Sequence, residues 1–285
     1  DGTNTIEDYF VYARCKPEQK SELIDEHLDH GVVGFLGEGI NDAMALKRAD
    51  IGFVVNNGSD VARQSGDVLL LEKSLNPVIA AVTMSREAFM KIRTYLLCTL
   101  TGNIGTLFSL TTVVVFWQQI PMLPIQILLN NILTDLPLMF LITDHISAES
   151  VKRPIRDEAK KFFKIIVIFA AISSLFDFIF FFTFRGYDIS VLRTGWFVFS
   201  VVAELTLVFS LRSELSLFKS PKMSKILGVV LVACYITAIA LPFLSFGSLF
   251  KLIPLTVFQI GILIGIAVVY LGANELAKKF LFRKK

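Results

Sequence analysis

The residues that decide the fold read Gly34-Phe35-Leu36-Gly37-Glu38-Gly39-Ile40-Asn41-Asp42-Ala43-Met44-Ala45-Leu46. They join a short apolar run to a helical pattern through a glycine-acid-glycine turn. The two glycines allow a tight turn and a close approach to a ligand. Glu38 and Asp42 supply carboxylate oxygens and Asn41 supplies an amide, a set that suits Mg²⁺ beside a phosphoryl group. An ordinary strand-to-helix turn, with Asn41 as the helix N-cap, is the alternative explanation of this motif taken alone.

The segments around this turn alternate between strand-like and helix-like patterns. Such alternation favours a parallel sheet with helices on its faces, in which ligands collect beyond the carboxyl ends of the strands. Four short strands make a small sheet with open edges, so we expect further strands upstream, and a start at Asp1 also suggests a fragment. The predicted strands are Tyr9–Arg14, Val32–Gly37, Ile51–Val55 and Asp67–Leu71, and the predicted helices are Pro17–His30, Asn41–Arg48 and Ser59–Ser65.

Apolar residues are concentrated in the later part of the chain. The sequence is 54% hydrophobic with a mean hydropathy of +0.63, yet 19% of it is charged, so the two kinds of residue must be segregated. From residue 94 onward, apolar stretches long enough to cross ~30 Å of hydrocarbon follow one another. We therefore expect the second half of a cytosolic domain over residues 1–75, a stalk helix over 76–93 and a membrane domain of six helices over 94–285. The predicted spans are Tyr95–Trp117, Met122–Thr143, Phe162–Phe184, Val191–Leu211, Ile226–Phe246 and Leu252–Leu271.

Basic residues set the expected orientation. Cations gather in segments 152–164, 212–225 and 278–285, whereas the opposite connections hold only Arg185, Arg193 and Lys251. Short loops rich in Lys and Arg stay on the cytosolic side, so both termini should be cytosolic in a multi-pass protein that we expect in the cell membrane. Topology and anionic headgroups then explain the net charge of +3, and no nucleic-acid partner is expected. The three cysteines show no disulfide framework or metal-ligand spacing.

Polar residues inside the predicted spans are costly and need a reason. The first span carries Asn103, the second carries Asn131, Thr134 and Asp135 on one helical face, and the fourth carries Glu204 near its middle. Such oxygen-bearing side chains, on helices loosened by glycine and proline, predict a cage for a transported cation. Hydrogen bonding between helices is the alternative, and for Glu204 it is a protonated carboxyl bonded to a neighbouring helix.

The third span holds two further features. Asp177 fits no motif, so packing, a local pair and a nearby water-filled cavity all stay open as its explanation. The phenylalanine-rich stretch Phe176–Phe184 is expected to face lipid.

Two segments resemble a known family. Gly37–Leu46, followed by Ala49-Asp50-Ile51-Gly52, is similar to the hinge motif of P-type cation-transporting ATPases, which usually reads Gly-Asp-Gly-x-Asn-Asp-Ala-Pro-Ala-Leu. Tyr12-Ala13-Arg14-Cys15-Lys16-Pro17-Glu18-Gln19-Lys20 resembles the segment of that family whose lysine reaches an aspartyl phosphate. The resemblance extends over essentially the whole chain.

This resemblance implies a fold and a set of roles. It implies a partial Rossmann-like α/β domain of the haloacid-dehalogenase type, followed by an all-α bundle of six transmembrane helices. Lys20 would neutralise phosphoryl charge, Asn41 would orient phosphate, and Glu38 with Asp42 would hold Mg²⁺, a division of labour typical of phosphoryl transfer. The implied cofactors are Mg²⁺ and ATP, with ATP bound by an upstream domain. The implied partners are the N-terminal half of the pump, from the same gene or in trans, the lipid bilayer and the cation.

The motifs in the membrane spans narrow the choice of transported ion. Asn131-Ile132-Leu133-Thr134-Asp135 resembles the Asn-x-x-Thr-Asp ion-site motif of calcium-type pumps, and Asn103 matches their preceding asparagine. Thr106 stands where calcium pumps carry a glutamate, which weakens a calcium assignment. Similarity to the magnesium-transporting branch is carried by Pro121-Met122-Leu123-Pro124, Leu128-Leu129-Asn130-Asn131 and Leu71-Glu72-Lys73-Ser74-Leu75. Magnesium is therefore the preferred ion, with a calcium-type pump as the alternative.

Several departures from the family pattern matter. The Asp-Lys-Thr-Gly-Thr phosphorylation motif is absent from this chain, so we expect no activity from the chain alone. Glu38 replaces the usual aspartate, and its extra methylene displaces a carboxylate by about 1 Å, enough to lower a rate about a hundredfold. Met44 replaces a proline. Glu38 and the missing aspartate motivate a second hypothesis, a non-catalytic remnant or regulatory membrane subunit, beside the leading hypothesis of a pump. A passive six-helix channel is a third hypothesis, but it leaves the strand-helix domain unexplained.

Overall fold

The computed structural model describes residues 11–72, 74–147, 151–152 and 159–282. The chain divides into two compact units, Asp1–Met84 and Ser85–Lys285. Residues 9–10 of the first predicted strand, and residues 153–158 and 283–285 of the predicted basic segments, lie outside the described residues.

The first unit contains a three-stranded parallel sheet in the order β1-β2-β3. Its two small apolar clusters pack helices against the sheet; one is formed by Ile24, Ala45 and Ala49, and the other by Leu46, Val54 and Ala62. Three of the four predicted strands and all three predicted helices are therefore confirmed. The strands are β1 (Gly34–Gly37), β2 (Ile51–Val55) and β3 (Val68–Leu70), and the helices are α1 (Pro17–Leu28), the 3₁₀ turn η2 (Ile40–Asp42), α2 (Ala43–Arg48) and α3 (Asp60–Ser65).

The predicted strand Tyr9–Arg14 is wrong over its described part, because residues 11–14 form no strand. Arg14 has a positive φ of 59°, in the left-handed region, which interrupts an extended chain. Pro17 then occupies the first position of α1, where its fixed φ suits a helix start and its missing N–H leaves no bond unmade.

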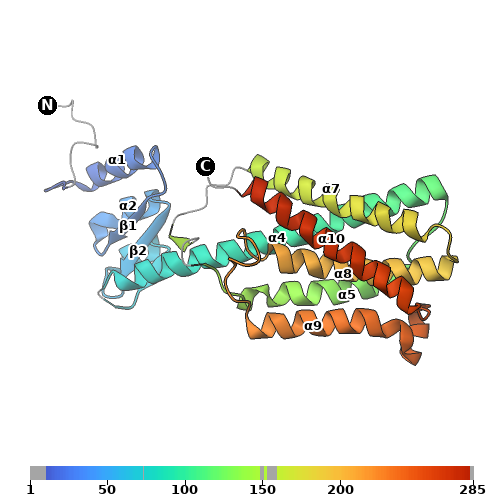
Figure 1. Cartoon of the computed structure of the whole chain (residues 1–285). Helices are drawn as coiled ribbons and strands as arrows, with labels where there is room; N and C mark the ends of the chain where they lie inside the picture. The colour runs from blue at the N-terminus through green and yellow to red at the C-terminus, as the bar shows by residue number, and fades with distance from the viewer. Residues whose placement is uncertain (1–10, 73, 148–150, 153–158, 283–285) are drawn as a thin grey trace. The chain divides into compact units, whose positions relative to one another are not determined.

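The later part of the chain contains six helices long and apolar enough to cross a membrane, counted over the described residues. Figure 1 shows α5, α7, α8, α9 and α10 lying side by side in a bundle. In its most apolar stretch α8 is 89% buried, and it packs against α5, α7, α9 and α10, so it is the central helix. The six are α4 (Asn76–Trp117), α5 (Pro124–Phe140, extended by η3, Leu141–Thr143), α7 (Ala159–Phe184), α8 (Ile189–Leu211), α9 (Lys225–Ala240, extended by η4, Leu241–Phe243) and α10 (Val257–Leu281).

The largest differences between the helices and the predicted spans lie in the first and the last span, and the last helix also ends at Leu281 rather than Leu271. The predicted stalk and the first span form one continuous 42-residue helix, α4, about 63 Å long. The last helix begins at Val257 rather than Leu252, because Pro254 precedes it and the hydroxyl of Thr256 caps it by accepting from the Gln259 amide at 3.3 Å.

The phenylalanine-rich stretch of α7 does not face lipid as a whole. Phe180, Phe181 and Phe184 are fully buried, whereas Phe182 is 65% exposed. Phe180 stacks on Phe199 of α8 with ring centroids 5.5 Å apart. These rings belong to the core because they lie on the face of α7 that packs against the central helix.

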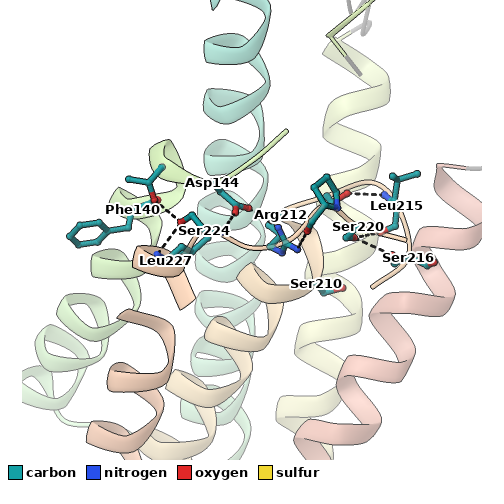
Figure 2. A network of polar contacts seen from close by, with 12 residues as sticks. Phe140, Asp144, Ser210, Arg212, Leu215, Ser216, Ser220, Ser224 and Leu227 are labelled. Carbon is teal, nitrogen blue, oxygen red and sulfur yellow. Dashed lines mark hydrogen bonds and ion pairs between the residues drawn. The ribbon is translucent and has the colours of Figure 1, made fainter. Parts of the chain in front are cut away.

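A buried polar network joins the ends of α5 and α8 to the start of α9 (Figure 2). Arg212 donates to Asp144 at 2.8 Å and to the carbonyl of Pro221. Asp144 also accepts from the Ser224 amide at 2.9 Å, and the Ser224 hydroxyl caps α9 by accepting from Leu227 at 3.1 Å. Three helices are thus tied together at one end of the bundle.

Candidate functional sites

The turn after β1 is closed by the carboxylate of Asp42. Its Oδ1 accepts from Lys20 Nζ at 2.7 Å, and its Oδ2 accepts from the amides of Glu38 at 3.1 Å and Gly39 at 3.0 Å. Asp42, and not Asn41, immediately precedes α2, so the alternative with Asn41 as N-cap is wrong. Both oxygens of Asp42 are therefore engaged by groups of the turn and of α1.

The ionic state of Asp42 follows from these contacts. Partial burial opposes its ionisation, but the hydrogen bond from Lys20 and those from the Gly39 and Glu38 amides outweigh burial, so the pKa of Asp42 lies below its usual value. The carboxylate is anionic at neutral pH and fixes the Lys20 ammonium at the carboxyl end of the sheet.

Gly37 is needed for this arrangement. A Cβ added at Gly37 would lie 2.7 Å from Cβ of Asp42, so any larger residue would displace the carboxylate. The Glu38 carbonyl accepts from the Ser59 amide at 2.8 Å, which ties the turn to the start of α3. The side chains of Glu38 and Asn41 are exposed, and Glu38 borders an open depression of about 270 Å³ at this edge.

The donors of this turn fit one mode of Mg²⁺ binding. No group of three or more His, Cys, Asp or Glu side chains within the described ranges could hold a metal ion by itself. Mg²⁺ commonly keeps several waters and takes only one or two carboxylates together with phosphate oxygens. Glu38 offers one free carboxylate for that mode, whereas the oxygens of Asp42 are already hydrogen-bonded.

A small cavity lies among α4, α5 and α8 in the membrane unit. Its volume of about 20 Å³ is enough for one water-sized sphere. Four of the five predicted ion ligands line it, namely Asn103, Thr134, Asp135 and Glu204. The fifth, Asn131, is exposed and does not line the cavity.

Glu204 is the central group of this cavity. Thr106 donates to its Oε1 at 3.3 Å, and the polar side chains of Thr134 and Asn130 also act on it. Asp135 adds a second negative charge nearby, and no lysine or arginine contributes to the electrostatics of Glu204 among the described residues. Two carboxylates with hydroxyl and amide oxygens, but without a basic partner, form an arrangement that a cation would stabilise.

Two residues that act on Glu204, Asn130 and Thr106, were not among the predicted ion ligands. Asn130 is buried, with its Oδ1 lacking a partner, whereas the predicted Asn131 points away from the cavity. Thr106 contacts Glu204 directly. Its spacing three residues after Asn103, on the same face of α4, was the available signal.

Comparison with known proteins assigns the chain to a family. The profile of a family described as "Cation transporting ATPase, C-terminus" matches residues 119–280. The chain belongs to the P-type cation-transporting ATPases. It is 31% identical to the "Magnesium-transporting ATPase, P-type 1" of Escherichia coli K12 over 282 residues, 96% of this chain and 31% of that protein.

Two further relatives are named for the transport of other cations. A "Calcium-transporting ATPase" of Bacillus subtilis is 27% identical over 99% of this chain and 33% of that protein. A "Probable copper-exporting P-type ATPase" of Archaeoglobus fulgidus is 44% identical over 94 residues, 33% of this chain. This member of the P-type ATPases spans about a third of the length of the magnesium- and calcium-transporting relatives that it matches.

Proposed function

We propose that this chain supplies the ion-binding membrane helices, and the C-terminal half of the phosphorylation domain, of a pump in which ATP hydrolysis through an aspartyl phosphate drives cation transport. The observation that carries the proposal is the cavity around Glu204, where acid, hydroxyl and amide groups meet without a basic partner for Glu204 among the described residues. Family membership and the Lys20–Asp42 pair support it from the other unit. The partner is the N-terminal half of the pump.

The first unit would serve phosphoryl transfer as part of a haloacid-dehalogenase-type domain spanning residues 1–75. Lys20 would neutralise charge on the phosphoryl group, with Asp42 as a positioning residue that holds its ammonium. Asn41, whose side chain is exposed beside the turn, would orient a phosphate oxygen. Glu38 would hold Mg²⁺, whose charge stabilises the transferring phosphate when it is bound.

Magnesium is the proposed transported ion. The magnesium-transporting relative matches at 31% identity and the calcium-transporting one at 27%, each over nearly the whole chain. Thr106 donates its hydroxyl to Glu204 and adds no charge there. A calcium-type pump is the second candidate, favoured by the Asn-x-x-Thr-Asp run that ends at Asp135. In either case both termini would be cytosolic in a multi-pass protein of the cell membrane.

Cation binding by the purified chain in lipid nanodiscs tests this assignment. Glu204→Gln removes a charged oxygen ligand while keeping the volume of the side chain, so Mg²⁺ affinity should fall about tenfold or more. Glu87→Gln removes a carboxylate that is exposed on α4 and should leave the affinity unchanged. Equal Mg²⁺ affinity in wild type and Glu204→Gln would refute the proposed ion site, and a Ca²⁺ titration in parallel decides between the two ions.

Glu38 motivates the competing function, a non-catalytic remnant or regulatory membrane subunit. Assembly with an upstream half that carries the phosphorylation motif, followed by assay of the phosphorylated intermediate and of turnover, separates the two. A pump slowed by the longer side chain should gain up to about a hundredfold in rate with Glu38→Asp. Turnover that stays near zero would favour the remnant. Ion flux through the purified chain without ATP would instead favour a passive channel.

A further inference from the structure

A second buried carboxylate lies in the bundle outside the Glu204 cavity. Asp177 of α7 is 4% exposed, and its Oδ1 accepts from the indole Nε1 of Trp196 on α8 at 3.4 Å. Its Oδ2 has no hydrogen-bond partner, and no ion pair includes Asp177 within the described ranges. One half of this carboxylate is thus left without a partner in the interior.

Asp177 lies among buried aromatic residues, and no positively charged group acts on it among the described residues. Trp196, Phe180 and Phe181 are fully buried, and the rings of Phe181 and Trp196 lie 4.7 Å apart. An ionised carboxylate without a counter-charge is strongly disfavoured in such an apolar site, whereas the neutral acid is tolerated. The geometry therefore favours a form of Asp177 that carries either a proton or a bound cation.

Hydrogen bonding distinguishes a proton from a cation at this position. Ser109 of α4 interacts with Asp177, but its hydroxyl already donates to the Gly105 carbonyl at 2.9 Å. Ser109 therefore has only acceptor capacity left to offer Asp177. A protonated carboxyl can donate to that oxygen, whereas a cation would find, among the described groups that act on Asp177, no neutral oxygen ligands other than the hydroxyls of Ser109 and Tyr270. A proton fits the site better.

We propose that Asp177 is a proton-binding site of the membrane domain, separate from the Glu204 cavity and coupled to it. The titratable groups that act on Asp177 are Glu204 from α8 and Tyr270 from α10, and neither can supply a positive charge. A cation that binds beside Glu204 adds positive charge near Asp177. This charge stabilises the ionised form of Asp177 and so favours release of the proton from its Oδ2 to the solvent. By linkage, a proton on Asp177 weakens cation binding by the same factor. The coupling, but not the proton site itself, rests on the proposed function of the Glu204 cavity.

Infrared spectroscopy of the full chain in lipid nanodiscs tests the proton site. At neutral pH the wild-type spectrum should contain a C=O stretching band of a protonated carboxyl that is lost in Asp177→Asn, a neutral variant that keeps an acceptor for Trp196. Ser109→Ala should shift this band to higher frequency without removing it, because a donor bond is lost and the proton stays. If the spectrum of Asp177→Asn keeps every protonated-carboxyl band of the wild type, the proposal is overturned. If Asp177→Asn does not fold, an unshifted band in Ser109→Ala overturns it instead.

Proton release on addition of Mg²⁺, followed with a pH-sensitive dye, tests the coupling. Asp177→Asn should release one proton fewer per bound Mg²⁺ than the wild type, and equal release would overturn the coupling. The Glu204→Gln variant separates the two proposals. If Mg²⁺ affinity does not change in that variant while the Asp177 band is still lost in Asp177→Asn, the ion-site proposal fails and the proton site stands.

Discussion

Breaking the buried pair between Arg212 and Asp144 should strongly destabilise the helix bundle. The two side chains are 7% and 6% exposed and meet at 2.8 Å, so solvent screens them little. Arg212→Met leaves Asp144 buried with only the Ser224 amide to stabilise its charge, at a cost of about 3–5 kcal/mol. Asp144→Asn leaves Arg212 uncompensated at a similar cost. The double variant buries no unpaired charge and should be more stable than the sum of the single effects predicts, by about 1–3 kcal/mol.

Reversible unfolding in mixed micelles of increasing denaturing-detergent fraction, followed by helical circular dichroism, measures these free energies. Arg185→Met is the matched control, since the exposed Arg185 guanidinium lies 5.5 Å from the ring centroid of Trp117 and should contribute less than about 1 kcal/mol. Single variants that cost no more than this control, with effects that add in the double variant, would refute the argument from burial.

Three further perturbations have defined outcomes. Asp42→Asn should lower the free energy of unfolding by about 1 kcal/mol, because Lys20 is partly solvated and solvent screens its ion pair with Asp42. The variant should also make the free energy of unfolding depend less on pH in the acidic range. The lowered pKa of Asp42 stabilises the folded form above the unfolded-state value of about 3.9, and this stability is lost as pH falls through the folded-state pKa; an identical pH dependence in the variant would contradict the assignment. Gly105→Ala should cost about 1–3 kcal/mol in the micelle assay, because its Cβ would lie 3.0 Å from Cβ of Ser173, whereas Gly265→Ala, with open space around it, should be neutral or slightly stabilising. Ser59→Ala removes the cap that accepts from the Ala62 amide at 3.2 Å and should cost about 1 kcal/mol in urea unfolding of the intact chain, and a loss below about 0.3 kcal/mol would exclude a capping role.

The membrane helices were predictable because their signal is length and hydropathy, which need no knowledge of neighbours. Six spans were expected, and six helices of suitable length and composition are present over the described residues. The ends of the helices were predictable only where the sequence contains a local signal, such as a proline or a capping residue. The start of the last helix at Val257 follows from two such signals, Pro254 and the cap at Thr256. The fusion of the predicted stalk and the first span into α4 follows from the absence of any proline between Val78 and Trp117 to end the helix.

The candidate site was only partly predictable, because a helix turns by about 100° per residue. Choosing Asn131 in place of Asn130 therefore moved the candidate from a buried side chain that acts on Glu204 to an exposed one, and only the packing of α5 on α8 decides between the two neighbours. The Lys20–Asp42 pair likewise joins residues 22 positions apart, and their contact depends on how α1 packs beside the turn. The sequence pattern identified both residues but did not predict that they bind each other.

The network at Arg212 also has an electrical consequence. Glu204 lies eight residues before Arg212 on α8, which places it about 12 Å deeper along the helix axis. Because Asp144 and Ser224 hold that end of α8 against α5 and α9, this depth is fixed and cannot drift by sliding of the central helix. Under the proposed function, an ion that enters from this end would pass somewhat less than half of a ~30 Å hydrocarbon core before it meets the carboxylate. Its binding should therefore sense a corresponding share of the transmembrane voltage, with the share set by an ion pair that the ion never touches.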